Sequence, residues 1–244
     1  MVAINKQRLD IIMVERGLAL TRTQAQALIM AGQVSAEGRR LDKPGAKFDY
    51  SMQLHVKNQP RYVSRAGDKL ASVAEHFRLD FTDKIILDVG SSTGGFTDLA
   101  LQQGASQVFC VDVGTGQLAY KLRQDPRVVV MERTDIRKAR LSSIADMAVM
   151  DVSFISLIKV LEPTAALVKS GGLIVAMAKP QFEAGKLLAD KYRGVIPLGH
   201  ERDTVLADLR EWMQARFELV SEMDSGLAGA EGNVERFFLL KAVS

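Results

Sequence analysis

The chain has 244 residues, enough for one large domain and a small one, and 47% of them are hydrophobic, which supports well-filled cores. The formal net charge of +3 is unevenly placed: residues 1–60 hold 9 Lys/Arg and 5 Asp/Glu, whereas residues 61–244 hold 23 and 24. A basic front segment on a near-neutral body favours a polyanion-binding module joined to a larger domain, and an ordinary solvated surface is the alternative.

Cys110 is the only cysteine, which excludes a disulfide framework and a cysteine zinc cluster and predicts a reducing, cytoplasmic location. No apolar run approaches 18 residues, so no membrane-spanning helix is expected. The first ten residues carry charges and lack the apolar centre of a signal peptide.

The front segment alternates short helical and extended patterns. Apolar residues at 9–13 predict a helix that stops at Gly17, and a second helix follows a capping Thr21 or Thr23 and ends at Gly32. Residues 33–38 and 52–56 read as strands on either side of a Lys-Pro-Gly turn.

These features resemble the S4-type RNA-binding domain. The resemblance rests on the Arg-Leu-Asp start at residue 8, Thr21-Arg22, the Gly32-Gln33-Val34 exit and the turn at residues 43–45. It implies a small α+β domain over residues 1–58, followed by a linker at residues 59–64. It also implies that RNA phosphates are contacted by Arg8, Arg22 and Lys43, although exposed helix arginines remain the alternative.

The second domain is organised around residues 85–98, IILDVGSSTGGFTD, which predict a buried strand, a glycine turn and a helix. That layout brings main-chain N–H groups close to a polar ligand. No Gly-Lys-Ser/Thr closes the turn, so it is not a phosphate-binding P-loop. Ser92 stands two residues after Gly90, so the dinucleotide pattern is absent too.

The acid, the hydrophobic-Gly pair and the later Gly-Gly resemble motif I of S-adenosylmethionine-dependent methyltransferases. That resemblance assigns cofactor contacts to the turn residues Asp88, Gly90, Ser91, Ser92, Thr93, Gly94, Gly95 and Phe96. Asp112 stands 22 residues after Gly90, at the end of the next predicted strand, where an acid receives ribose hydroxyls. Further contacts are predicted at Val113, Asp135, Ile136 and Asp151. A simple Asx-turn at Asp135 is nearly as good an interpretation.

Alternating strands and helices continue to the end of the chain and predict a doubly wound, Rossmann-like α/β domain over residues 65–244. Strands are expected at 85–87, 108–111, 128–131, 147–150, 173–178, 217–222 and 234–242, the last two as a hairpin. Helices are expected at 66–77, from 96, at 157–167 and at 201–216, and an irregular loop at 185–199.

Four charged residues lie at element ends that this fold brings to one rim: Lys69, Asp151, Lys179 and Glu235. The strand end at Asp151 reads Asp-Val-Ser-Phe and lacks the Pro-Pro-aromatic pattern of enzymes that methylate base amino groups. Cys110 lies inside a predicted buried strand, which disfavours a cysteine nucleophile and hence cytosine-carbon methylation. Four unrelated polar strand ends are the alternative interpretation.

The four residues resemble the Lys-Asp-Lys-Glu set of FtsJ-like RNA ribose 2′-O-methyltransferases. YVSRAGDKL, LDVGSSTGGFTD, VDVGTGQLAYKLR, MDVSFISL, KPQFEAGK and GNVERFFL occur in order, and with the front domain they resemble the hemolysin-A (TlyA) family of rRNA 2′-O-methyltransferases. The resemblance implies methylation of cytidines in rRNA or ribosomal subunits, with no metal and no membrane involved. We predict that Lys179 is the base and Lys69 its electrostatic partner, and that Arg65, Arg133 and Arg137, near the same expected rim, also contact the rRNA.

Two other classes of function stay open at this point. One is an RNA-binding or ribosome-assembly factor whose methyltransferase body is inactive, against which the intact glycine turn and charged set argue. The other is membrane lysis, for which no spanning or lytic amphipathic segment is present. Nicotinamide-dependent chemistry lacks its glycine pattern.

Overall fold

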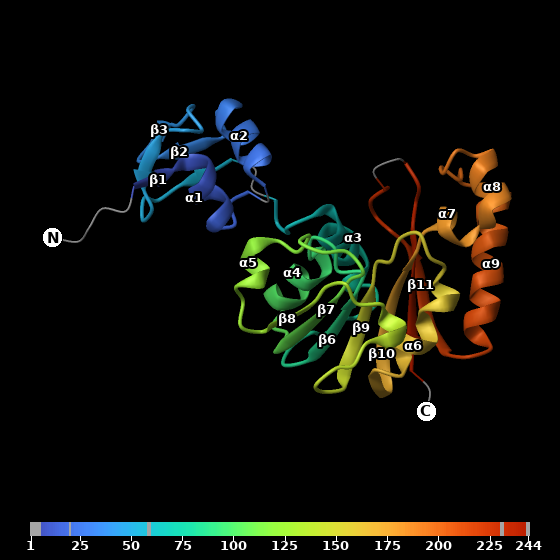
Figure 1. Ribbon diagram of the computed structural model, residues 1–244. Helices are drawn as coiled ribbons and strands as arrows, with labels where there is room; N and C mark the ends of the chain where they lie inside the picture. Colours follow the sequence, from blue (N-terminus) through green and yellow to red (C-terminus); the bar gives the residue numbers. More distant parts are fainter. Residues whose placement is uncertain (1–5, 20, 58–59, 230–231, 243–244) are drawn as a thin grey trace.

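The computed structural model describes residues 6–19, 21–57, 60–229 and 232–242 as a small amino-terminal domain beside a larger α/β body (Figure 1). The predicted linker at residues 59–64 falls partly outside the described residues. Its later part differs from the prediction: Tyr62 and Val63 are buried in the core of the body. The Val63 N–H donates to Asp98, so the chain is already anchored to the body there.

The small domain has two helices packed on short strands, as its sequence predicts. Its helices are α1 (Leu9–Glu15) and α2 (Arg22–Met30); its strands are β1 (Lys6–Arg8), β2 (Val34–Ala36), β3 (Arg39–Arg40), β4 (Lys47–Asp49) and β5 (His55–Val56). Thr21 caps α2 by accepting from the Gln24 N–H, one of the two caps considered. The sequence does not predict β1, β3 and β4, because strands of two or three residues are too short to show an alternating pattern.

The body is built on a twisted sheet that has seven strands among the described residues, in the order β11-β12-β10-β9-β6-β7-β8. Its parallel strands are β6 (Ile85–Val89), β7 (Gln107–Val111), β8 (Val128–Met131), β9 (Ala145–Met150) and β10 (Val168–Ala178). The hairpin of β11 (Glu218–Asp224) and β12 (Arg236–Lys241) pairs antiparallel to β10 and confirms that prediction. The order reverses at β6, where open α/β sheets bind ligands.

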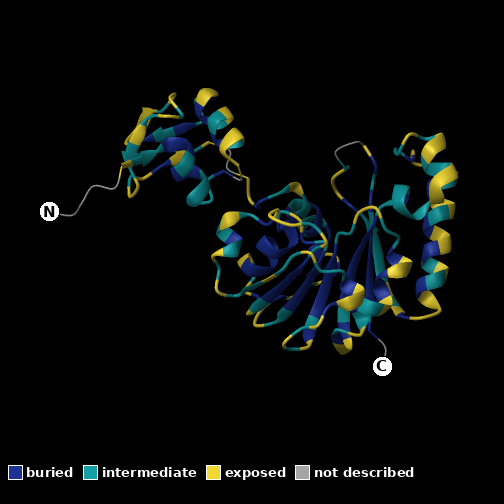
Figure 2. Ribbon diagram, in the orientation of Figure 1, coloured by how far each residue is buried: buried dark blue, intermediate teal, exposed yellow. Residues whose placement is uncertain are grey.

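Helices cover both faces of this sheet, which confirms the doubly wound architecture (Figure 1). One face packs against α3 (Arg65–Ala74), α4 (Gly95–Gln102) and α5 (Tyr120–Arg123); the other packs against α6 (Leu161–Ala165) and α9 (His200–Gln214). Neighbouring residues along a strand point to opposite faces of the sheet: Ile86 packs in the core beneath α3 and α4, and Leu87 packs in the core beneath α6 and α9. The inner strands β12, β10, β9, β6 and β7 are accordingly buried along most of their length, whereas the edge strands β8 and β11 are partly exposed (Figure 2).

Two predicted segments of the body differ in the structure. The helix expected over residues 157–167 is a 3₁₀ turn, Leu157–Lys159, followed by the short α6. Pro163 explains the break, because its ring excludes the carbonyl of Lys159 from a continuous helix. The loop expected over residues 185–199 contains α8 (Gly185–Lys191), whose Lys, Leu and Ala residues are good helix formers.

Gly95 lets α3 lie close to the glycine turn that follows β6. A Cβ at Gly95 would stand 2.4 Å from the Ser64 Oγ and 2.8 Å from both the Ala66 Cβ and the Gly67 nitrogen. Real Cβ atoms do not tolerate such contacts, so α3 would have to move. Since α3 carries Lys69, this close approach also places a charged residue near the turn.

We therefore predict that Gly95→Ala destabilises the body by about 1–3 kcal/mol through overpacking between α3 and α4. Thermal unfolding should show a melting temperature lower by several degrees, at about 2–4 °C per kcal/mol for a domain of this size. An unchanged melting temperature would contradict the packing described for this helix pair.

Candidate active site

Three adjoining cavities of about 530, 350 and 240 Å³ lie along the carboxyl ends of the parallel strands. Asp151, the residue that follows β9, lines all three. Gly90 and Ser92 line both larger cavities, and Ser153 lines the largest and the smallest. The three cavities therefore form one composite site around Asp151.

The largest cavity lies beyond β6 and β7 and has acidic residues at its edge. Asp112 follows β7 and accepts hydrogen bonds from the Ser92 N–H at 2.8 Å and the Gly114 N–H at 2.7 Å. A carboxylate has about four acceptor positions, so two remain for a ligand's hydroxyl donors. Val113 and Ile136 line the same cavity and supply apolar surface.

Asp135 also lines this cavity, and it forms the Asx-turn that is the alternative interpretation of this residue. It accepts from the Arg137 backbone N–H at 3.0 Å, which is the Asx-turn, and it pairs with the Arg137 guanidinium. The hydrogen bond from that guanidinium lowers the pKa of Asp135 to about 2. The side chain is therefore a fixed acceptor at the cavity edge.

The second cavity is formed by the glycine turn and the start of α3. Gly90 has φ +79°, and a Cβ there would stand 2.7 Å from the Asp151 carbonyl oxygen, so only glycine fits between β6 and β9. Among the predicted turn residues, Gly94 lines none of the three cavities. It begins α4 as its N-cap, with φ +92°.

Asp88 is buried below this turn with only half of its carboxyl group satisfied. Its Oδ2 accepts from the Thr97 N–H and hydroxyl, whereas its buried Oδ1 has no hydrogen-bond partner among the described residues. Burial raises the pKa of Asp88 to about 7. An unpaired buried oxygen beside a cavity is the arrangement expected where a polar ligand supplies the missing partner.

The third cavity brings the four predicted catalytic residues together as two ion pairs. The Lys179 Nζ lies 2.6 Å from the Asp151 Oδ1, and the Lys69 Nζ donates to the Glu235 Oε1 at 2.6 Å. Burial raises the pKa of Asp151, and the charge of Lys179 opposes that shift. The second oxygen of Glu235 is buried and has no hydrogen-bond partner among the described residues.

Several residues of this site were not predicted from the sequence. Ser153 accepts from the Lys179 Nζ at 2.7 Å, and Gln181 contributes a buried amide oxygen without a partner among the described residues. Phe154 is 91% exposed and has a left-handed backbone with φ +63°. The centroid of its ring lies 5.0 Å from the centroid of the Phe182 ring. The signal was present, since both phenylalanines stand three residues after a strand-end charge.

The cations predicted to contact RNA are distributed over both domains. In the small domain Arg8 and Arg22 both donate to the buried Asp10, at 2.9 and 3.1 Å, and Lys43 is exposed in its turn. The hydrogen bond from Arg8, with those from Gln26 and Arg22, holds the pKa of Asp10 well below its usual range. Asp10 thereby fixes the direction of two guanidinium groups.

In the body the other three predicted cations stand near the cavities or on the surface. Arg65 lines the second cavity and donates to the Ala228 carbonyl at 2.7 Å. Arg137 lines the largest cavity, and Arg133 is exposed at the edge of the sheet with φ +52°. These positions are compatible with phosphate contacts near the rim.

Three further features of the described residues concern metal binding, membrane spans and a cysteine nucleophile. The described residues contain no group of three or more His, Cys, Asp or Glu side chains that could hold a metal ion. In the same part of the chain no helix combines the length and apolar character needed to cross a bilayer. Cys110 is buried in β7, and burial raises the pKa of its thiol, so it is poorly suited to be a nucleophile.

The doubly wound sheet, the glycine turn after β6 and the acid after β7 define a Rossmann-like methyltransferase. The chain belongs to the FtsJ-like methyltransferase family, whose profile matches residues 62–242, and it carries an S4 domain that matches residues 7–53. Both expected resemblances are thereby confirmed.

Relatives resemble the chain over both domains. YqxC of Bacillus subtilis is 46% identical over 96% of this chain and 85% of its own. The 16S/23S rRNA (cytidine-2′-O)-methyltransferase TlyA of Mycobacterium tuberculosis is 39% identical over 97% of this chain and 90% of its own. A solved structure from Streptococcus thermophilus, 40% identical, superposes with a TM-score of 0.71 over 99% of this chain and 90% of its own.

The raised pKa of Asp88 makes a prediction about stability and pH. A carboxyl group whose folded-state pKa lies above its unfolded value of about 3.9 stabilises the fold below that value. The contribution is lost as the pH rises through about 7. Asp88→Asn, which keeps a neutral group, should therefore gain stability relative to the wild type between pH 4.5 and 7.5.

Urea unfolding of both proteins at these two pH values measures the difference. We expect the free energy of unfolding of the variant, minus that of the wild type, to rise with pH. A difference that stays constant, or that falls, would contradict a protonated Asp88 below the turn.

Proposed function

We propose that the protein transfers a methyl group from S-adenosylmethionine to the ribose 2′-hydroxyl of a cytidine in rRNA. The observation that carries this proposal is the shared position of Asp151, which lines the two larger cavities and also pairs with Lys179 in the third. A cofactor cavity and a lysine-lined cavity therefore meet at one residue. The name of the TlyA relative supports the choice of rRNA and of cytidine.

The residues around the two larger cavities fit S-adenosylmethionine. Asp112 has acceptor positions left for the two ribose hydroxyls, and Asp135, Ile136 and Val113 offer a polar and apolar edge suited to adenine. The other predicted contacts on the turn, namely Ser91, Ser92, Thr93, Gly95 and Phe96, line the second cavity. When bound, the cofactor supplies an electrophilic methyl group on a sulfonium.

The two ion-paired lysines have different roles toward the 2′-hydroxyl. Lys179 in its neutral form, after its own ammonium proton has passed to solvent, accepts the hydroxyl proton at Nζ, and Asp151 stabilises the ammonium that results. Lys69, held by Glu235, keeps a positive charge near the oxygen on which negative charge develops. Both pairs are held in place before substrate arrives, so the remaining contribution is the alignment of the oxygen with the methyl group.

Phe154 is suited to hold the target base. It is almost fully exposed although it is large and apolar, and its left-handed backbone is unfavourable for a residue with a Cβ. Exposed aromatic rings stack on unpaired bases, which matches an enzyme that must reach the ribose of one nucleotide. The S4 domain supplies further contacts through Arg8, Arg22 and Lys43.

Loss of Lys179 tests the proposal. Lys179→Ala should lower the rate of methyl transfer to rRNA by roughly 100-fold or more, because the proton acceptor is removed. The assay follows tritiated methyl groups from S-adenosylmethionine into ribosomal subunits taken from cells that lack the gene. Lys169→Ala, on the opposite end of the same strand and exposed, is the matched control and should retain full activity.

Cofactor binding, measured by titration calorimetry, should change little in Lys179→Ala, because Lys179 does not line the two larger cavities. Full activity in that variant would refute its role as the base. A wild-type protein that binds rRNA but neither binds S-adenosylmethionine nor transfers methyl groups would favour the RNA-binding assembly factor instead.

Loss of the Phe154 ring tests the base contact separately. Phe154→Ala should raise the KM for RNA and lower kcat/KM by about 5–150-fold, since stacking contributes about 1–3 kcal/mol per base. Leu187→Ala, an equally exposed apolar residue on α8, is the control and should behave as the wild type. Steady-state kinetics on rRNA give both values, and an unchanged KM in Phe154→Ala would count against stacking.

A further inference from the structure

A carboxylate outside the four catalytic residues joins two loops of the active site. Glu183 is the last residue of α7 (Pro180–Glu183), the turn that directly follows Lys179. Its Oε2 accepts from the Ser156 hydroxyl at 2.6 Å, and its Oε1 accepts from the Leu157 N–H at 2.9 Å. Ser156 and Leu157 end the loop that begins at Asp151.

The loop of residues 151–156 therefore touches the chain from Lys179 to Glu183 at three successive points. At its start Lys179 reaches both Asp151 and Ser153. In its middle the Phe154 ring packs on the Phe182 ring, and at its end Glu183 holds Ser156 and Leu157. The first contact carries the chemistry and the second forms the exposed aromatic surface.

The third contact is the one that determines where the loop ends. Ser156 is also the N-cap of the 3₁₀ turn, accepting from the Ile158 N–H at 3.2 Å, so its hydroxyl is fixed from both sides. Leu157 is buried, and its N–H would lose its partner without Glu183. An unpaired buried N–H is unfavourable, so the loop end would move to find another acceptor.

Such a movement would disturb the contacts of Ser153 with Lys179 and of Phe154 with Phe182, because both lie within a few residues of Ser156. Phe154 occupies a left-handed backbone conformation, which persists only where its surroundings hold it. A loop released at Ser156 would relax at Phe154 first and would then change the approach of Ser153 to Lys179.

We propose that Glu183 is a positioning residue for methyl transfer: through Ser156 and Leu157 it holds the 151–156 loop so that Asp151 and Ser153 meet Lys179 and Phe154 lies on Phe182. The inference rests on the proposed function, because it assigns Lys179 and Phe154 their roles from there. Glu183 itself touches neither of the ion-paired lysines in the described contacts.

Paired substitutions separate positioning from simple stability. Glu183→Ala removes both acceptors and should lower kcat by roughly 10–100-fold, the scale of a misplacement near 1 Å. Glu183→Gln should recover most of that loss, because its amide oxygen can accept from Leu157 and its amide nitrogen can donate to the Ser156 hydroxyl. Because residues 151–155 line the largest cavity, the affinity for S-adenosylmethionine should fall together with kcat in Glu183→Ala, whereas Glu211→Ala, a change of an exposed carboxylate on α9, should leave both at the wild-type value.

The double variant Ser156→Ala/Glu183→Ala should be at most slightly slower than Glu183→Ala alone, because the contact between Ser156 and Glu183 is already lost and only the cap on the Ile158 N–H is removed in addition. Wild-type kcat in Glu183→Ala would overturn the proposal. So would a Glu183→Gln variant as slow as Glu183→Ala, since the amide preserves the contact geometry. If the wild type itself transfers no methyl group to rRNA, the proposed function fails, and this result is visible in the same assay.

Hydrogen exchange tests the contact without any activity measurement. In Glu183→Ala the amides of residues 152–158 should exchange faster than in the wild type, whereas Glu183→Gln should restore their protection. Unchanged exchange in Glu183→Ala would overturn the inference whether or not rRNA is the substrate.

Discussion

The ion pair between Asp151 and Lys179 depends on how two neighbouring strands are aligned. β9 and β10 run parallel with Met150 opposite Ala176, so both strands end at the same edge of the sheet. Parallel pairing thereby places an acid and a lysine that are far apart in sequence within 2.6 Å. The backbone of Asp151 also packs directly against Gly90, so the glycine turn after β6 lies beside this ion pair. The three cavities consequently meet at Asp151.

The second pair, Lys69 with Glu235, comes from the two ends of the body. Lys69 lies on the helix before the first strand of the sheet, and Glu235 directly precedes the last strand. Because β12 is antiparallel to β10, its amino end meets the carboxyl ends of the parallel strands. Both side chains are buried, so each charge needs the other to remain inside the protein. Arg202, which donates to the Val234 carbonyl, fixes the backbone beside Glu235.

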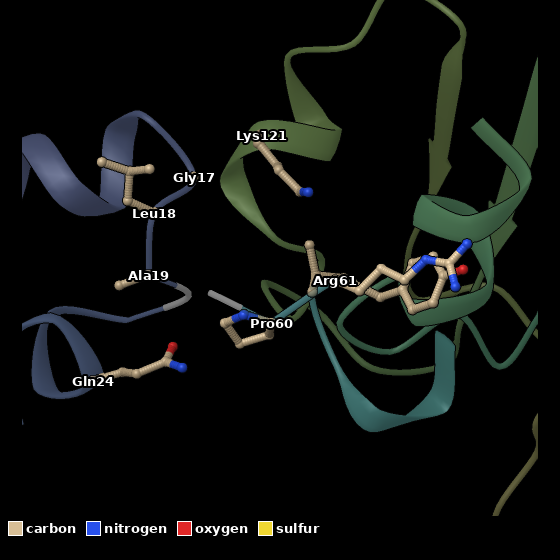
Figure 3. A pocket seen from close by; sticks show the side chains of 9 residues that line it. Gly17, Leu18, Ala19, Gln24, Pro60, Arg61 and Lys121 are labelled. Atoms are coloured by element: carbon tan, nitrogen blue, oxygen red, sulfur yellow. The ribbon is translucent and has the colours of Figure 1, made fainter. Parts of the chain in front are cut away.

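The small domain lies against the body beside the start of the connection between them. Asp98 on α4 is buried; it accepts from the Val63 N–H and pairs with Lys121 of α5. The Lys121 side chain lies against Gly17 of the small domain, where a Cβ would stand 2.9 Å from its Cδ. A cavity of about 370 Å³ remains between the two domains there (Figure 3). A short connection anchored at Val63 brings the S4 domain close to the body.

The sequence predicts the sheet and the meeting of Asp151 with Lys179 well, because both follow from strand ends. Apolar runs ended by Asp88, Asp112, Asp151 and Lys179 are visible without a structure, and the doubly wound topology brings them to one edge. What sequence patterns missed depends on contacts between distant segments. Ser153 and Glu183 are ordinary polar residues until the loops that carry them are folded together. Helix α8 was missed because polarity suggested a loop, and the strands of the small domain were too short for periodicity to show.

The chemistry of the labelled product shows whether the methyl group is transferred to a ribose oxygen or to a base. Ribosomal subunits labelled by the protein with tritiated S-adenosylmethionine are hydrolysed with alkali, and the labelled nucleoside is identified by mass spectrometry. Methylation of the 2′-oxygen blocks alkaline cleavage at that nucleotide, so we expect label in alkali-resistant dinucleotides that contain 2′-O-methylcytidine. Label in alkali-sensitive mononucleotides with the methyl group on the base would contradict it.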